Sequence, residues 1–410
     1  TSAVMFDILL AACALVAIIG IVTAACGRAR NGWLLTGCGI GLGILAKGPV
    51  ILLHVLPLAM LAPLWHPQRE RTNGWGRWYA GLLAALAIGA AIALAWAIPA
   101  ALQGGRDYAQ AIFWHQSAGR LVDSFAHREP FYWYLPWLPL LLFPWSLWPP
   151  VWRALAGLRR SGGWQARLLL AWIIPAFAGF SLISGKQVHY LLPLLPGFAL
   201  LAGRGLADGP GRQRGWRDRW LVSAVMLIAA GILLWLPIRA TAVHHLPAWV
   251  ATISPMTALL VIVCALAVLL PIRTVEGQTR LLAGVAIALI AVLLLGIGRC
   301  AAPYYDLSGA ARVVGSIQAR HEPVAHVGKY HDRFQFLGRL TQPVTVIGPA
   351  QVLSWARAHP RGYVVAYFAH RLNEAGGITP LYTQPYRDQW LTIWPAIAIA
   401  QRPQLVAKMN

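Results

Sequence analysis

Long apolar segments constrain the fold of this chain more than any other feature of its sequence. We interpret ten segments as membrane helices, at 4–25, 33–47, 49–65, 78–101, 131–152, 168–183, 190–207, 220–238, 250–271 and 281–299. A helix needs roughly 17–25 mostly apolar residues to span a bilayer. Only 11% of the residues are charged, against about 25% in soluble domains. The composition therefore excludes a water-soluble globular enzyme and a disordered chain, and it predicts a polytopic α-helical membrane protein.

The positive charges alternate in number from one loop to the next. Sixteen Lys and Arg residues lie in one set of loops between the segments, and six lie in the alternate set. Loops rich in cations stay in the cytoplasm, so the six-cation face and the C-terminal tail are predicted to be external. Most of the net charge of +21 is then a topology signal and not a nucleic-acid-binding surface.

The C-terminal tail differs in composition from the rest of the chain. Short apolar runs alternate with polar residues and predict strands at Pro323–Val327, Pro343–Ile347, Tyr363–Phe368 and Trp390–Ile397, with a helix at about 350–358. We therefore expect two domains, a transmembrane domain over 1–301 and a small extracytoplasmic α/β domain over 302–410.

Lysine is rare, and its positions are informative. The membrane part has only Lys47 and Lys186, and both lie at predicted external helix ends, where the topology rule gives no reason for a cation. A compact ammonium at the membrane surface suits a phosphate group. The alternative is that each lysine simply extends from a helix end to the interface.

The external loop and helix start at 103–137 mix charged and aromatic residues. Cations and anions balance there, with Arg120 and His127 near Trp114 and several further aromatic side chains. Such a mixture suits a headgroup or a sugar, and the alternative is an interfacial aromatic belt with solvated charges.

Two further polar positions stand out beside the apolar segments. Asp7 lies near the external end of the first segment, and a carboxylate inside a membrane is costly and is usually functional; the alternative is a pair with a nearby Lys or Arg. His189 follows a short polar loop, where it could be a hydrogen-bond donor, a metal ligand or a packed interfacial residue.

Six short motifs occur in a fixed order along the chain. They are DILL at 7–10, ILAKGPV at 44–50, Phe-Trp followed by Arg120 at 113–120, AHREPFYWYLP at 126–136, FPW at 143–145 and SGKQVHYLLPLLP at 184–196. In this order the chain resembles the polytopic glycosyltransferases of the GT-C type. It is most similar to their lipid A aminoarabinose transferase branch, which is related to the protein O-mannosyltransferases.

The resemblance implies a bacterial inner-membrane enzyme that takes a sugar from a polyprenyl-phosphate carrier such as undecaprenyl phosphate. The sugar would pass, with inversion, to an external acceptor such as lipid A or another glycolipid. The resemblance further implies the following roles: the carrier phosphate on Arg120, Lys47 and Lys186, a catalytic Asp7, and loop residues Trp114, His127, His189 and Tyr190 near the substrate.

Two features separate this chain from the pattern of that family. Relatives often have Glu-His where Gln116 and Ser117 stand here, so no cofactor is certain and a divalent metal remains possible. Relatives also have about three more helices and a large external loop with a catalytic carboxylate before the position of Asp7. We therefore expect a further N-terminal portion, and we expect these 410 residues to be inactive alone.

Two other classes of function also fit the sequence. A transporter or flippase of lipid-linked sugar intermediates could use Asp7, Lys47 and Lys186 to line a pathway. Transporters usually carry inverted repeats and polar groups at the membrane midplane, whereas the polar residues here gather on one face. A structural membrane subunit would need only scattered external charges.

The predicted orientation can be tested by labelling single cysteines. With the five native cysteines replaced, a cysteine at Ser184 should react with a membrane-impermeant maleimide added outside, and one at Gly162 should react only after permeabilisation. Labelling of position 162 in sealed cells would contradict the orientation.

Overall fold

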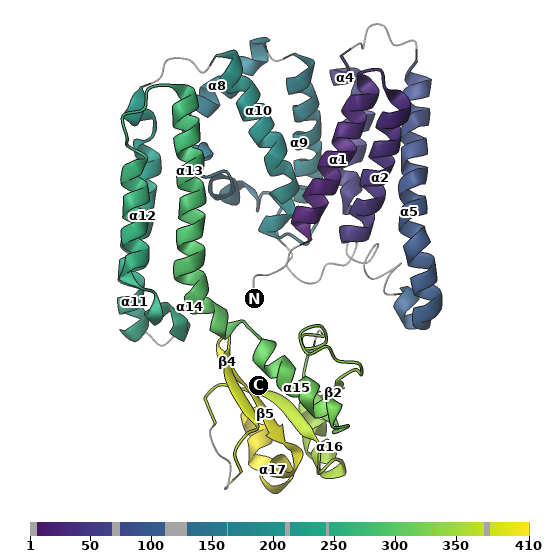
Figure 1. Cartoon of the computed structure of the whole chain (residues 1–410), viewed down its shortest axis with the longest axis vertical. Helices are drawn as coiled ribbons and strands as arrows, with labels where there is room; N and C mark the ends of the chain where they lie inside the picture. Colours follow the sequence, from purple (N-terminus) through teal and green to yellow (C-terminus); the bar gives the residue numbers. More distant parts are fainter. Residues whose placement is uncertain are drawn as a thin grey trace. The chain divides into compact units, whose positions relative to one another are not determined.

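The computed structural model describes residues 6–67, 74–110, 129–161, 163–209, 214–242, 246–330, 332–372 and 378–409 (Figure 1). Contacts within the chain divide it into two compact units. Among the described residues, the first unit comprises those within 3–223 and 268–286, and the second comprises those within 224–267 and 287–410.

The chain is mostly helical. The α-helices up to residue 208 are α1 (Asp7–Ala25), α2 (Ala29–Lys47), α3 (Leu52–Met60), α4 (Ala62–Trp65), α5 (Trp75–Gln110), α7 (Leu138–Leu141), α8 (Pro149–Ser161), α9 (Trp164–Leu182) and α10 (Leu195–Asp208). The next helices are α11 (Trp220–Ala242), α12 (Pro255–Ala267), α13 (Val275–Leu293) and α14 (Arg299–Ala301). Helix α5 is interrupted at Gly105, where φ is 79°.

Seven helical stretches among the described residues are long and apolar enough to cross a membrane. They are Asp7–Ala25, Ala29–Met60, Trp75–Arg106, Trp164–Leu182, Val188–Asp208, Trp220–Ala240 and Val275–Ala319. The predicted multi-pass helical fold is therefore confirmed, although individual segments differ. The segments predicted at 33–47 and 49–65 meet in one stretch, Ala29–Met60. The one predicted at 250–271 contains the end of the 3₁₀ helix η7 (Ala248–Thr252) and the 13-residue helix α12.

The segment predicted at 131–152 is broken into short pieces. It contains the 3₁₀ turns Leu135–Trp137 and Trp145–Leu147, the four-residue helix α7 and the first residues of α8. Five of its residues are proline, at positions 136, 139, 144, 149 and 150. Proline removes a backbone donor and clashes with the preceding turn, so the apolar run cannot form one long helix.

Helices α1 and α2 lie side by side in Figure 1 and pack closely because small residues line their contact. A Cβ atom built on Gly39 would lie 2.9 Å from the Cβ atom of Ala17, so only glycine fits there. The Thr36 hydroxyl donates to the carbonyl oxygens of Gly32 at 2.9 Å and of Ala17 at 3.2 Å. Small residues and hydroxyl groups commonly hold helices together in lipid.

The C-terminal part forms a five-stranded sheet in the order β2-β1-β3-β5-β4. The strands are β1 (Val324–Val327), β2 (Thr345–Ile347), β3 (Tyr363–Phe368), β4 (Tyr382–Tyr386) and β5 (Gln389–Pro395). Strand β1 pairs in parallel with β2 and β3, and β5 pairs antiparallel with β3 and β4. Helices α15 (Ser308–Ala319), α16 (Val352–Ala358) and α17 (Ala396–Gln401) accompany the sheet.

The small C-terminal α/β domain is confirmed, with strands close to the four predicted ranges and a helix over 352–358. The strand missed by the sequence analysis is β4, which has the sequence YTQPY. Proline is confined to edge strands because it cannot donate to a ladder, and β4 lies at the edge of this sheet.

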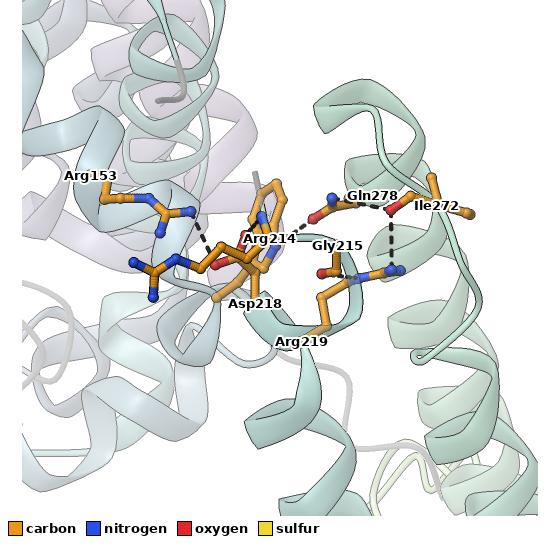
Figure 2. A network of polar contacts seen from close by, with 8 residues as sticks. Arg153, Arg214, Gly215, Asp218, Arg219, Ile272 and Gln278 are labelled. Carbon is orange, nitrogen blue, oxygen red and sulfur yellow. Dashed lines mark hydrogen bonds and ion pairs between the residues drawn. The ribbon is translucent and has the colours of Figure 1, made fainter. Parts of the chain in front are cut away.

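A polar network joins the segment before α11 to the segment before α13 (Figure 2). Arg219 is fully buried, and its Nη2 atom donates to the carbonyl oxygens of Leu270 at 2.7 Å and Ile272 at 3.3 Å. Gln278 donates to the same Ile272 oxygen at 3.2 Å and accepts from the indole of Trp148. The network therefore holds the segment before α11 against the backbone of residues 270–272.

Asp218 extends the same network on the other side of Arg219. Its carboxylate accepts from the Arg153 guanidinium at 3.1 Å and from the backbone N–H of Arg214 at 2.8 Å. The sequence analysis counted Arg153 and Arg219 only among the loop cations that indicate the topology. In the structure, the side chains of both also hold loops in place.

Replacing Arg219 by glutamine should destabilise the protein in detergent. The substitution removes charge-assisted hydrogen bonds made by a fully buried guanidinium, at a cost of about 1–3 kcal/mol. The exposed neighbour Arg217 is the matched control, since Arg217→Gln removes the same charge without a buried contact. Equal thermal unfolding midpoints for the two variants would contradict the assigned role.

Candidate functional site

The start of α1 and the end of α2 bring a carboxylate and an ammonium together. Asp7 is the first residue of α1, and Lys47 is the last residue of α2. Because the two helices run antiparallel on either side of a short turn, the start of one lies beside the end of the other. The Lys47 ammonium donates to the Asp7 carboxylate, whose side chain is only 4% exposed.

His189 and Tyr190 lie against the same pair. The Nε2 atom of His189 is 3.8 Å from the second carboxylate oxygen of Asp7, and the Nζ atom of Lys47 is 4.4 Å from the centre of the Tyr190 ring. These four residues, Asp7, Lys47, His189 and Tyr190, are called the Asp7 cluster below. An ammonium over an aromatic face gains further electrostatic stabilisation.

Local sequence explains why the members of the cluster meet. Gly48 follows Lys47 with φ at 77°, a conformation that glycine adopts easily and that ends α2 there. Residues Val188–Leu194 form the 3₁₀ helix η5, which packs on α1 and carries His189 and Tyr190 to its start. Three of the sequence motifs, at 7–10, 44–50 and 184–196, therefore contribute residues to one cluster.

Lys186 takes a different place from the Asp7 cluster. It is buried, and its ammonium donates to the carbonyl oxygens of Glu129 at 2.8 Å and Ile183 at 2.6 Å. Burial lowers the pKa of Lys186, while the carboxylate of Glu129 acts in the opposite direction. Lys186 therefore joins two loops by hydrogen bonds to their backbone oxygens. Its role toward a phosphate stays a prediction.

Two more hydrogen bonds join these loops. The backbone N–H of Glu129 donates to the Ser184 carbonyl at 3.1 Å, and the Tyr134 hydroxyl donates to the Gln187 carbonyl at 3.3 Å. Tyr134 is fully buried, and burial raises its pKa to about 12, so its hydroxyl stays protonated as a donor. The motif at 126–136 therefore meets the motif at 184–196.

Glu129 and Tyr134 were not singled out as site residues by the sequence analysis. Their partners lie more than fifty positions away along the chain, so no local pattern could identify the contacts. Their membership of the 126–136 motif was the only available signal.

Three of the predicted site residues, Trp114, Arg120 and His127, lie outside the described residues, which resume at Glu129. The structure thus brings together Asp7, Lys47, His189 and Tyr190, and it places Lys186 in the adjoining loop contact. In the described part of the chain, no group of three His, Cys, Asp or Glu side chains could hold a metal ion. Within the Asp7 cluster, the Lys47 ammonium already occupies the position that a cation would take beside the carboxylate.

Known proteins similar to this chain are transferases of the kind that its motifs resemble. No family model matches the chain. It is 33% identical over 211 residues to the undecaprenyl phosphate-alpha-4-amino-4-deoxy-L-arabinose arabinosyl transferase 1 of Pseudomonas fluorescens Pf-5, which covers 49% of this chain and 35% of that protein. It is 35% identical over 192 residues to the corresponding transferase 1 of Sodalis glossinidius, covering 43% and 31%.

The matched region spans about a third of the length of these curated relatives. Solved structures extend the likeness to almost the whole chain. The structure of ArnT from Cupriavidus metallidurans bound to undecaprenyl phosphate superposes with a TM-score of 0.64 at 19% identity, covering 95% of this chain and 74% of that one. The apo structure gives a TM-score of 0.62.

The chain therefore has the fold of ArnT, and its predicted resemblance to the aminoarabinose transferase branch of the GT-C membrane glycosyltransferases is confirmed.

Proposed function

We propose that the chain serves a membrane glycosyltransferase reaction, in which a sugar moves from a polyprenyl-phosphate carrier such as undecaprenyl phosphate to an acceptor outside the cytoplasm. Lipid A or another glycolipid is the acceptor class that we propose. The observation that carries the proposal is the Asp7 cluster, which is built from motif residues at one end of a membrane helix pair. Sequence similarity to arabinosyl transferases supports it.

The chemistry needs a cation beside the carrier phosphate. When the bond between the anomeric carbon and the phosphate oxygen breaks, the electron pair and the negative charge stay on that oxygen. A preorganised donor that meets the developing charge contributes roughly 3–4 kcal/mol. One hydrogen of the Lys47 ammonium is committed to Asp7, and an ammonium has three donors, so two remain for a phosphate.

Asp7 acts in this proposal as a positioning residue. Its buried carboxylate holds the Lys47 ammonium, and Tyr190 lies under the same ammonium. The role of a catalytic base that receives the acceptor's proton is the other use of Asp7, and we favour positioning because one oxygen is already engaged. A single displacement inverts the anomeric centre and needs no covalent intermediate on the protein.

The remaining predicted residues extend the proposed site. Arg120 would supply a second cation for the phosphate, and Trp114 and His127 would contact the sugar. Lys186 would act through the loop contact that it makes with Glu129. The chain is a multi-pass membrane protein, and we propose the bacterial inner membrane, with the C-terminal sheet domain in the periplasm.

Replacing Lys47 by alanine should lower sugar transfer by at least about 100-fold, the loss typical of one preorganised donor. Because we expect these 410 residues to be inactive alone, transfer from an undecaprenyl-phosphate-linked sugar would be measured in membranes with the chain joined to its further N-terminal portion, at matched protein levels. Arg77→Ala is the control, because Arg77 is an exposed cation at the start of α5.

Unchanged transfer by the Lys47→Ala protein would refute the proposed phosphate contact. A flippase would instead move the labelled carrier lipid across a vesicle bilayer without loss of its sugar, and that result would replace the transferase proposal by the transporter alternative.

The Asp7–Lys47 pair should show strong coupling in a double-mutant cycle of thermal stability. Asp7→Asn or Lys47→Met alone leaves one charge without its partner, at about 1–3 kcal/mol, whereas the double variant should recover part of that loss. The exposed pair Glu276–Arg280 is the matched control, since surface pairs couple by only about 0.3–0.5 kcal/mol. Additive losses at Asp7 and Lys47 would contradict the pairing.

A further inference from the structure

The C-terminal sheet has a cavity at the carboxyl ends of two neighbouring parallel strands. After β1 the chain passes to β2, which lies on one side of the β1–β3 pair. After β3 it passes to β4 and β5, which lie on the other side. In open α/β sheets, ligands bind at the point where connections leave adjacent parallel strands in opposite directions. The turn between β4 and β5 lies at the same edge, because Phe368 at the end of β3 pairs with Trp390.

The cavity has a volume of about 370 Å³ and a basic lining. Its lining includes Gly328 and Lys329 after β1, Arg333, Tyr367 at the end of β3, and Tyr386 and Arg387 at the β4–β5 turn. Three cations therefore line it, with Asp388 as the single lining acid. In the described part of the chain, no carboxylate lies within ion-pair distance of Lys329, Arg333 or Arg387.

Both arginines are positioned by an aromatic ring instead of by a carboxylate. The guanidinium carbons of Arg333 and Arg387 lie 5.8 Å and 5.4 Å from the centre of the buried Tyr386 ring. An aromatic face attracts a guanidinium without using its N–H groups. Arg333 also shares a side-chain hydrogen bond with the lining residue Tyr367, and the other donors of the two arginines stay available, since a guanidinium has five. Guanidinium donors match the oxygens of a phosphate in spacing and charge.

The histidine that contacts the lining residue Tyr367 is uncharged. The Nε2 atom of the fully buried His326 lies 3.3 Å from the hydroxyl of Tyr367, and burial lowers the pKa of His326 to about 4. The imidazole is therefore neutral near pH 7, and the positive charge of the cavity comes from the three lining cations.

We propose that this cavity binds a phosphate monoester, with Lys329, Arg333 and Arg387 contacting its oxygens. The same chemistry could come from a phosphorylated sugar or from free inorganic phosphate. This inference does not rest on the proposed transferase reaction, because it concerns other residues and predicts binding and not turnover.

Binding should be measured by calorimetry on the whole chain in nanodiscs of phosphatidylcholine, a zwitterionic lipid with no net charge. The probes are glucosamine 1-phosphate, glucosamine and inorganic phosphate. We expect saturable binding of glucosamine 1-phosphate, no binding of glucosamine, and at least a tenfold loss of affinity in Arg387→Gln and in Arg333→Gln.

Arg357→Gln is the matched control, because Arg357 is an exposed cation on α16 in the same domain and does not line the cavity. It should bind glucosamine 1-phosphate like the unchanged protein. Two arginine variants at separate points of the lining protect the test against a folding defect in either one, and equal unfolding midpoints would show that both are folded.

Tighter binding of glucosamine 1-phosphate than of inorganic phosphate would support the site and identify a phosphorylated sugar as its source. Equal affinities would support the site with free phosphate as sufficient ligand. Absence of saturable binding of both glucosamine 1-phosphate and inorganic phosphate would overturn the proposal. An equal loss of affinity in Arg387→Gln and Arg357→Gln would also overturn it.

Discussion

A carboxylate placed at the end of a membrane helix needs a partner, and the Asp7–Lys47 pair meets that need. An isolated charge is costly in apolar surroundings, and it persists when it is paired. The pair requires the ends of α1 and α2 to lie in contact, which in turn requires small residues such as Ala17 and Gly39 along the helix interface. The same stretch of sequence therefore determines how the two helices pack and which charged groups meet at their ends.

Much of the fold follows from patterns that are local in the sequence. Apolar runs located the membrane helices, and short alternating runs located four of the five strands, since each element shows its own period or length. Proline-rich residues 131–152 escaped that reasoning because hydropathy alone does not register the loss of backbone donors. Strand β4 escaped it because a polar edge strand with Pro385 has little apolar pattern to detect.

The site was predictable in its residue types and only partly in its contacts. Rarity and position singled out Lys47 and Lys186, yet one pairs with a carboxylate and the other ties two loops through backbone oxygens. Nothing local distinguishes these uses, because Asp7 is 40 positions from Lys47 and Glu129 is 57 positions from Lys186. The same holds for Arg219. Its charge fits the topology pattern, but its guanidinium donates to the backbone oxygens of Leu270 and Ile272, which are about fifty positions away.

The close contact between Ala17 and Gly39 links the packing in the middle of the helices to the position of the Asp7 cluster at their ends. Gly39 precedes Lys47 by eight positions, about 12 Å along the axis at 1.5 Å per residue. A larger side chain at Gly39 would push α2 away from α1 and would act at a distance on the ammonium at its end. Loss-of-function substitutions are therefore expected to follow a stripe of small residues deep in the bilayer as well as the polar rim. Tolerance to substitution along α2 should thus follow the helical repeat and not the distance from Lys47.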